Sequence, residues 1–449
     1  MYIKNIINNN MNNPEKSNIK KPSRDKYNES NINVIPREQL YPKELIKPVE
    51  TSGPPPELYP KDMTKFNQIP YRMECIRNMI DGKVLDCMID FKNDASDNIG
   101  LNDDIREMLP KKYIDFNKAI KDLGGKLLYI KSGSTGHTFK GVYPPPNNEN
   151  NPNYAVKIVA YPRKENYGDM FNVKRPENAE LLMIRLLSNF VKNKQTPHII
   201  LPITTFNTSI KPFIGLPKDN IVCNKKYDMF VKRYKKGEYY DNVSILISEW
   251  ANSGDLLDYL KSNYKTMQVK HWRSILFQIL SVLAIIQNKY PAFRHNDMKA
   301  NNILIQKIHI DKDNSNFKYK INGQIYIVPN IGIQIKLWDF DFACIPGIVD
   351  NSKVEADWTD RINVKPEQNR YYDIHYFLNT LTVKGFFPEF WTDDVIPEKI
   401  RDFFRRVVPS KYTKDTKYVS ERGRILIDDE YMTPDYILKN DSLFKVMRN

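Results

Sequence analysis

The sequence RHNDMKANNIL at residues 294–304 restricts the fold of this chain more than any other stretch. It places Asp297, Lys299 and Asn302 within six residues and then continues into an apolar run at 303–305, which can form a strand that holds the polar group against a core. A carboxylate, a lysine and an amide in this arrangement can accept a proton, bind a phosphate and coordinate a divalent metal ion. The alternative is a polar loop whose Asp and Asn only form structural hydrogen bonds. Features elsewhere in the sequence must distinguish the two interpretations.

The composition predicts a soluble protein of a reducing, intracellular compartment. The chain has 449 residues, of which 41% are hydrophobic, enough for one large or two ordinary domains. Its four cysteines, Cys75, Cys87, Cys223 and Cys344, form no CxxC pair, so neither a zinc site nor a disulfide framework is expected. No apolar run approaches the roughly 18 residues of a membrane span, and the first residues lack the apolar core of a signal peptide.

The N-terminal part of the chain predicts a tail and an extension. Residues 1–65 are rich in Asn, Lys, Ser and Pro and are expected to be disordered. The net charge of +14 suits nucleotides, nucleic acid or anionic lipid without distinguishing among them, and the basic run at 20–24 either contacts such a partner or is simply solvated. Apolar residues at helical spacing in residues 66–123 predict a helical extension packed on the main domain.

Strand patterns begin after residue 123 and enclose a glycine-containing turn. Two extended runs within residues 126–142 are separated by Gly133, Ser134 and Gly136. The backbone N–H groups of such a turn can face phosphate oxygens, because glycine lets the backbone approach closely. An ordinary hairpin turn explains the same pattern, and Lys131 stands where a GxGxxG motif has its first glycine.

A lysine and a glutamate follow on the next two predicted elements. Lys157 lies within the apolar run 154–159 at the spacing of a phosphate-binding lysine. Residues 176–187 predict a helix, with a proline near the start and acidic residues in the first turn. Glu180 on this helix is placed to pair with Lys157. Glu177 is the competing candidate, and either carboxylate is alternatively a surface charge favoured by the helix dipole.

Residues 244–260 predict a buried strand, a short connector and the start of a helix. The connector begins with Glu249 and Trp250, and its free backbone groups can hydrogen-bond an adenine edge. Asp255 either meets the nucleotide or only caps the following helix. A strand is also predicted at 199–203, and the basic insertion at 211–240 has no assigned role.

A second carboxylate follows a β-rich region near residue 339. A hairpin is predicted around Asn322-Gly323, within an insertion at 306–333, and the run 333–337 then leads to Asp339. A carboxylate there can face Asp297 and Asn302 and bind Mg²⁺, which takes hard oxygen ligands. Helices are predicted at 271–290, 371–381 and 400–408. Asp373, on the second of these, is expected to hold the loop of residue 297 by hydrogen bonds.

The order of these features resembles the protein kinase family: glycine turn, strand lysine, helix glutamate, connector, HxDxKxxN and DFD. The sequences DFDFA and YYDIHYF, with the insertion before the former, look like the serine/threonine kinases of poxviruses and their giant-virus relatives. The resemblance covers residues 126–449. It implies an α+β fold with two lobes, a small β-rich N-lobe at 124–250 and a larger, mainly helical C-lobe at 251–449.

The resemblance also implies ATP and Mg²⁺ as cofactors and protein substrates with serine or threonine acceptors. The implied nucleotide-binding residues are Gly133, Ser134, Gly136, Lys157, Glu180, Glu249, Trp250 and Asp255, with Ser248 beside the adenine. The implied metal ligands are Asn302 and Asp339. The implied catalytic residues are Asp297, which would deprotonate the acceptor hydroxyl, and Lys299, which would steady the γ-phosphate. Such kinases act in virion assembly, so virion proteins as partners and a location in the virion and host cytoplasm are expected.

The sequence departs from the kinase pattern and leaves two rival interpretations. Asn296 stands where an arginine usually precedes the catalytic aspartate, Asp341 replaces the glycine of DFG, and no clear APE is present. Regulation by a phosphorylated activation loop is therefore not expected. A choline or aminoglycoside kinase would share His-x-Asp and use Asp339 with Asp341 as a metal pair, and a pseudokinase scaffold would only bind partners. Lys299 and the connector favour the protein kinase.

Overall fold

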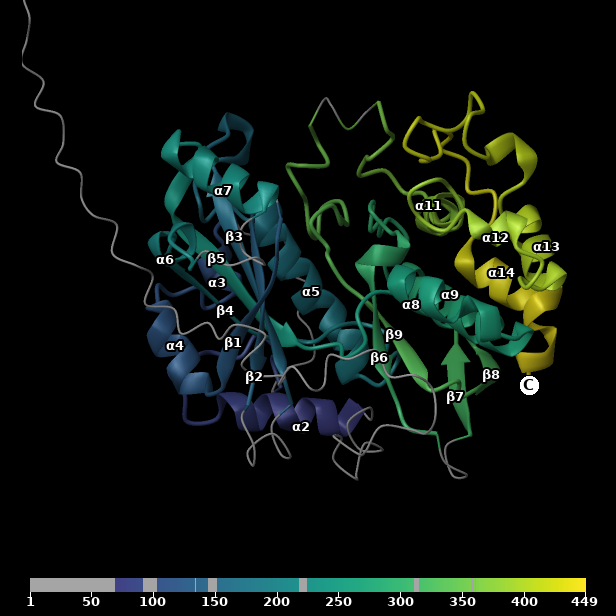
Figure 1. The fold of residues 1–449 in the computed structure, drawn as a ribbon, viewed down its shortest axis with the longest axis horizontal. Helices are drawn as coiled ribbons and strands as arrows, with labels where there is room; N and C mark the ends of the chain where they lie inside the picture. The colour runs from purple at the N-terminus through teal and green to yellow at the C-terminus, as the bar shows by residue number, and fades with distance from the viewer. Residues whose placement is uncertain are drawn as a thin grey trace, which may run out of the picture.

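The computed structural model describes residues 69–91, 103–133, 135–143, 152–217, 224–310, 315–356, 359 and 361–449. They form two lobes side by side, one built on a β-sheet and the other mainly helical (Figure 1). The predicted α+β fold with a small β-rich lobe and a larger helical lobe is therefore confirmed. The predicted tail at 1–65, Ser134 and Cys223 lie outside the described residues.

The first lobe contains a five-stranded sheet whose neighbouring strands are all antiparallel, in the order β1-β2-β3-β5-β4. Its strands are β1 (Lys126–Ser132), β2 (Gly136–Val142), β3 (Tyr154–Pro162), β4 (Pro202–Ser209) and β5 (Tyr239–Glu249). Most side chains of β3, β4 and β5 are buried, because helices and the second lobe cover the sheet. The predicted strand at 154–159 is thus the first part of β3, which is the middle strand of this sheet.

Helix α5 (Pro176–Lys192) lies between the sheet and the second lobe (Figure 1). Proline at its first turn and Glu177 beside the helix N-terminus start it as the sequence predicts, and nearly all of its residues are buried. The helix therefore carries its polar residues into the interior, where each needs a partner.

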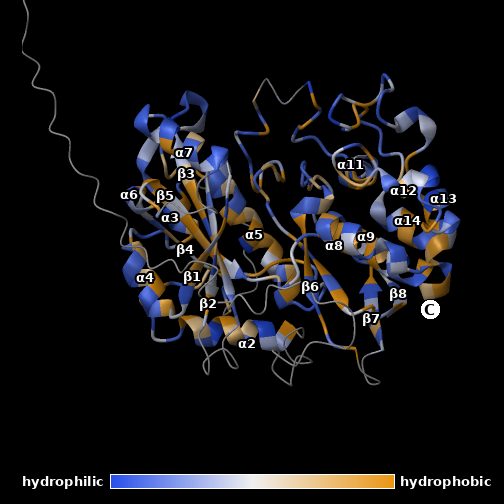
Figure 2. Ribbon diagram, viewed as in Figure 1, coloured by the Kyte–Doolittle hydropathy of each residue, from blue (hydrophilic) through white to orange (hydrophobic). Residues whose placement is uncertain are grey.

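The second lobe is organised around α9 (Val269–Lys289), whose apolar residues are almost all buried. Figure 2 shows this apolar helix and its apolar neighbours within the lobe. The other helices of the lobe are α8 (Leu256–Asn263), α11 (Tyr372–Leu381), α12 (Glu389–Thr392), α13 (Glu398–Val407) and α14 (Pro434–Asn440). Among the residues that the structure describes, α9 is the one helix long and apolar enough to cross a membrane, a property that buried core helices share.

Two short antiparallel sheets complete the second lobe. Strand β6 (Ile303–Lys307) pairs with β9 (Ile333–Leu337), and β7 (Asn316–Ile321) pairs with β8 (Gln324–Pro329). The β7–β8 turn is Asn322-Gly323, with φ of +46° and +88°, so the hairpin prediction is confirmed. These two residue types tolerate positive φ, which explains why the turn could be recognised from sequence.

The strand predicted at 199–203 is largely wrong. The strand that forms, β4, begins at Pro202 and continues to Ser209. Residues 199–201 instead belong to the connection between α5 and β4 and contact the second lobe, since the Ile200 N–H donates to the Leu337 carbonyl at 3.3 Å. The apolar run is buried for that reason, and burial alone does not distinguish a strand from a buried connection.

The segment before the sheet contains α2 (Ile69–Ile80), α3 (Ile105–Met108) and α4 (Phe116–Leu123). The basic insertion at 211–240 contains α6 (Lys211–Ile214) and α7 (Lys225–Lys235). Helix α2 places its apolar side chains, Met73, Ile76 and Met79, in the core of the first lobe.

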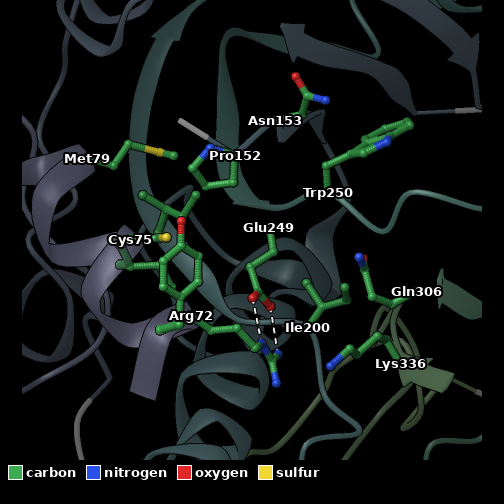
Figure 3. A pocket seen from close by; sticks show the side chains of 13 residues that line it. Arg72, Cys75, Met79, Pro152, Asn153, Ile200, Glu249, Trp250, Gln306 and Lys336 are labelled. Carbon is green, nitrogen blue, oxygen red and sulfur yellow. Dashed lines mark hydrogen bonds and ion pairs between the residues drawn. The ribbon is translucent and has the colours of Figure 1, made fainter. Parts of the chain in front are cut away.

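One arginine of α2 connects the helix to the connector between the lobes. Arg72 donates to both carboxylate oxygens of Glu249 at 2.7 Å (Figure 3). It also donates to the carbonyls of Pro197 at 2.9 Å and Ile199 at 2.7 Å. Burial would raise the pKa of the Glu249 carboxyl, but the Arg72 guanidinium outweighs it and the pKa is lowered. All three guanidinium nitrogens of Arg72 are thus used to fix the end of β5 and the segment at 197–199.

Replacing Arg72 by Met is expected to lower the free energy of unfolding by about 2–3 kcal/mol. The variant removes the Arg72 donor from a carboxylate and two carbonyls. The loss stays moderate because Glu249 is 20% exposed and keeps the Leu201 N–H at 2.7 Å, and the Pro197 carbonyl keeps the Lys336 ammonium at 2.6 Å. Arg77→Met, on the exposed face of the same helix, is the control and should lose no more than about 1 kcal/mol. Chemical denaturation of both variants measures the difference, and equal losses would contradict the assignment.

Candidate active site

The backbone of the loop that carries Asp297 is held by hydrogen bonds to Asp373 on α11. Its carboxylate accepts from the backbone N–H of His295 at 2.7 Å and of Asn296 at 2.9 Å. Asp373 is completely buried, and Asn296 has a φ of +61°, a conformation that asparagine tolerates better than most residues. The predicted role of Asp373 in holding this loop is therefore confirmed.

The loop brings Asp297, Lys299 and Asn302 together, as the spacing predicts. The Lys299 ammonium lies 2.7 Å from Oδ2 of Asp297, and the Asn302 side-chain amide donates to the same oxygen at 3.0 Å and to the Asp297 carbonyl at 2.9 Å. The Asp297 side chain is 13% exposed, so it can still meet a substrate. Its orientation is fixed by the groups around it.

Sequence reasoning missed Arg424, which is the third partner of Asp297. Its guanidinium donates to Oδ1 of Asp297 at 2.7 Å and to the carbonyl of Asn296 at 3.1 Å, and it stacks over the ring of Tyr376 at 4.1 Å. Arg424 is buried and lies 127 residues along the chain from Asp297. No local pattern marks an arginine in a loop as the partner of a carboxylate so far away, so the sequence held no signal for it.

The site contains a second cluster of charged side chains, centred on Lys157. Its ammonium lies 2.5 Å from Glu180 on α5 and 2.8 Å from Asp339, which follows β9 in the second lobe. The competing candidate, Glu177, instead pairs with Arg175 at 3.1 Å. The predicted pairing of Lys157 with Glu180 is therefore confirmed, and the same lysine connects the two lobes.

The charges of this cluster do not balance. Burial would lower the pKa of Lys157, but the carboxylates of Asp339 and Glu180 outweigh it, so the pKa is raised and the ammonium stays charged. Burial would raise the pKa of Asp339, but Lys157 lowers it to about 2. One ammonium thus faces two carboxyl groups: Asp339, which is ionised and has a side chain 37% exposed, and Glu180, whose pKa burial raises to about 7. A further cation is favoured at this place.

Asp339 and Asn302 lie at the same end of the β6–β9 pair. Ile303 is opposite Leu337 in the antiparallel register, so the residue before β6 and those after β9 meet at one edge. His295 adds a direct link, since its Nε2 lies 3.0 Å from the carbonyl of Trp338. Asp339 itself has a φ of +64°, which turns its carboxylate toward Lys157.

The donor set fits Mg²⁺ with a nucleotide. Asp339 and Asn302 offer hard oxygen ligands, and Mg²⁺ commonly takes one or two protein ligands together with substrate phosphates. Among the described residues, no group of three or more His, Cys, Asp or Glu side chains that could hold a metal ion is present. The surplus of negative charge around Lys157 supports the same fit.

The two glycines of the predicted turn differ in how closely other backbone atoms approach them. A Cβ on Gly136 would lie 1.7 Å from the Ile158 carbonyl oxygen, so only glycine lets β2 approach β3 there. A Cβ on Gly133 would meet only the Gly136 carbonyl oxygen, at 3.8 Å, and the Gly133 N–H donates to that oxygen at 2.7 Å. The Gly133 N–H is thus used within the turn and Gly136 is explained by packing, so the contact of this turn with phosphate stays a prediction.

The connector residues Glu249, Trp250 and Asp255 each have a different contact. The Glu249 side chain is bound to Arg72 on α2, so only its backbone can serve a nucleotide. The Trp250 ring lies under the Lys140 ammonium at 5.0 Å. Asp255 caps α8, accepting from the Asp258 N–H at 3.0 Å, so the capping alternative is confirmed and its contact with a ribose stays a prediction.

Comparison with known proteins gives consistent matches. Residues 154–435 match the family described as "Poxvirus serine/threonine protein kinase". Similar proteins include two from Acanthamoeba polyphaga mimivirus, each named "Putative serine/threonine-protein kinase": one is 45% identical over 84% of this chain and 80% of its own length, the other 24% over 67% and 85%. The "Serine/threonine-protein kinase 2" of Fowlpox virus is 24% identical over 61% of this chain and 57% of its own length.

Proposed function

This chain belongs to the poxvirus serine/threonine protein kinase family, and we therefore propose that it transfers the γ-phosphoryl group of ATP to serine or threonine hydroxyls of proteins. The observation that carries the proposal is the contact of Lys157 with both Glu180 and Asp339. It joins a strand and a helix of the first lobe to the edge of the second lobe where the Asp297 loop lies. Phosphoryl transfer depends mainly on such positioning and on charge neutralisation.

ATP supplies the phosphoryl group, and Mg²⁺ neutralises charge on its phosphates. Lys157 would bind the α- and β-phosphates, with Glu180 fixing the ammonium. Asp339 and Asn302 would bind the metal ion. The remaining nucleotide contacts would come from the turn residues Gly133, Ser134 and Gly136, from the connector backbone at Glu249 and Trp250, and from Asp255 at the ribose.

Asp297 would orient the acceptor hydroxyl and accept its proton. Its two oxygens are held by different partners, Oδ1 by Arg424 and Oδ2 by Lys299 and Asn302. A carboxylate held in this way keeps its orientation when the hydroxyl arrives, so little reorganisation accompanies transfer. Lys299, beside it, would steady the γ-phosphate.

Two observations favour this function over its rivals. Asp341, which a small-molecule kinase would use with Asp339 as a metal pair, forms an ion pair with Lys353 instead. A pseudokinase scaffold would have no need to keep the Lys157–Glu180 pair and the partners of Asp297 together. We further propose a role in particle assembly, with the protein in the virion and host cytoplasm; its support is that the relatives named above are viral proteins.

The purified full-length chain tests the proposal with radiolabelled ATP and Mg²⁺. Casein-like proteins, choline and an aminoglycoside are offered in parallel, and labelled protein is hydrolysed to identify the phosphoamino acid. Label is expected on serine or threonine of protein and should disappear when EDTA removes the metal ion. Label on choline or the aminoglycoside alone would identify a small-molecule kinase. A lack of label on any acceptor, together with no thermal stabilisation by ATP, would indicate a scaffold.

A further inference from the structure

A pocket beside Asp297 is lined partly by residues that have no role in the proposed phosphoryl transfer. It encloses about 990 Å³ of space open to solvent, and Asp297 and Lys299 form one wall. We call it the acceptor-side pocket. Its other walls come from the segment after Asp341, from α11 and from residues 414–424. An acceptor side chain that reaches Asp297 would bring its neighbouring residues to this pocket.

The acceptor-side pocket has a surplus of positive charge. Four cationic side chains line it, Lys299, Lys414, Arg422 and Arg424, against the carboxylates of Asp297 and Glu421. Lys299 and Arg424 are both occupied by Asp297, each at 2.7 Å. Lys414 and Arg422 are exposed, and neither forms an ion pair with any carboxylate in the described part of the chain. Two cations at the mouth of the pocket are thus available to a ligand.

The backbone segments that carry Lys414 and Arg422 are held by hydrogen bonds to α11 and to Asp297. The side chain of Asn379 on α11 donates to the Gly423 carbonyl at 2.9 Å and accepts from the Lys414 N–H at 3.3 Å, so one residue holds both segments. The Arg424 guanidinium then attaches the second segment to Asp297 itself. The backbones of Lys414 and Arg422 therefore keep their distance from the place where the acceptor hydroxyl would lie.

The remaining walls are mostly apolar. The aromatic and aliphatic side chains that line the pocket are Phe342, Ile362, Tyr376, Val383 and Phe386. They offer contact area to a peptide but select no charge. Charge selection falls to Lys414 and Arg422, because like charges brought beside them are disfavoured and an anion is attracted.

We propose that the acceptor-side pocket binds an anionic side chain close in sequence to the acceptor serine or threonine, with Lys414 and Arg422 as its partners. The anion is the carboxylate of Asp or Glu or the phosphate of an already phosphorylated residue, since both present oxygens to the same cations. This inference rests on the proposed protein kinase function and names its substrate class.

The test uses the full-length chain and four peptides that share one serine acceptor. The flanking positions carry Glu, phosphoserine, Gln or Lys, and kcat/KM is measured for each. We expect the Glu and phosphoserine peptides to exceed the Gln peptide by about tenfold, and the Lys peptide to be the poorest. The anionic peptide with the higher kcat/KM shows whether the pocket favours carboxylate or phosphate.

Variants assign the preference to particular residues. In the double variant Lys414→Gln with Arg422→Gln, the ratio of Glu to Gln peptide is expected to fall to about one. Arg422→Glu should reverse the order and favour the Lys peptide. Lys399→Gln, an exposed lysine on α13 outside the pocket, is the control and should leave the ratio as in the unaltered chain. Thermal melting of each variant checks that the fold is retained.

The outcomes separate this inference from the proposed function. Equal kcat/KM for the Glu, phosphoserine and Gln peptides in the unaltered chain would overturn the inference while leaving the kinase activity established. A preference that survives in the double variant would overturn the role of Lys414 and Arg422. Failure to label any peptide or protein would overturn the proposed function, and the inference with it.

Discussion

Replacing Asp297 by Asn is expected to lower kcat by about 10²–10⁴-fold, because the amide keeps the shape of the carboxylate but cannot accept the proton of the acceptor hydroxyl. The amide keeps one oxygen, which can accept from either Lys299 or Arg424, and the Asp373 carboxylate still holds the loop backbone, so the loop should keep its conformation. Single-turnover phosphorylation of a casein-like protein measures the effect. Because the nucleotide contacts lie elsewhere, the KM for ATP should change little.

The control for this variant is Asp258→Asn, the same chemical change at an exposed residue in the first turn of α8. It should retain the activity of the unaltered chain. If Asp297→Asn also keeps its turnover while melting as the unaltered chain does, Asp297 does not accept the proton, and another group near the acceptor has that role.

Replacing Lys157 by Met is expected to lower kcat/KM by about 10²–10³-fold, since it removes the cation that would lie against the α- and β-phosphates. The KM for ATP should rise together with the loss in turnover. Lys126→Met, an exposed lysine on β1, is the control and should have neither effect. A Lys157→Met enzyme with full kcat/KM would refute the assignment of the phosphate site.

The same variant has a predicted pH dependence of stability. Burial raises the pKa of the Glu180 carboxyl to about 7 even though Lys157 opposes the shift. A carboxyl whose pKa is higher in the folded state stabilises the fold below its unfolded pKa of about 4.3, and this contribution is lost as the pH rises through the folded value. Without Lys157 the folded pKa rises further, so the loss continues to higher pH.

We therefore expect the stability difference between the unaltered chain and Lys157→Met to be larger near pH 8 than near pH 6. In the unaltered chain the loss ends once Glu180 has ionised, at a pH of about 7, whereas in the variant it continues. Chemical denaturation at the two pH values measures this. A difference that is equal at both, or smaller at pH 8, would show that Glu180 is not the group left without a partner.

Features governed by local chemistry were predictable from the sequence. The Asn322-Gly323 turn, the helix that begins at Pro176 and the strand around Lys157 follow from turn residues, helix-start residues and apolar runs. The proximity of Asp297, Lys299 and Asn302 was predictable for the same reason, because a short loop places them together once the strand after it is buried. The local pattern failed at residues 199–201, because a buried connection has the same apolar composition as a buried strand.

The sequence by itself determined which residue types were present, the elements that carry them and their order, and from these the two-lobed fold and the family resemblance. Only the tertiary structure decided which charges meet: Glu180 rather than Glu177 beside Lys157, Arg424 beside Asp297, and Arg72 beside Glu249. Periodicity and turn chemistry act over a few residues. The partner of a buried charge depends on how elements from 23 to 177 residues apart pack, and on the free energy lost when a buried charge has no partner.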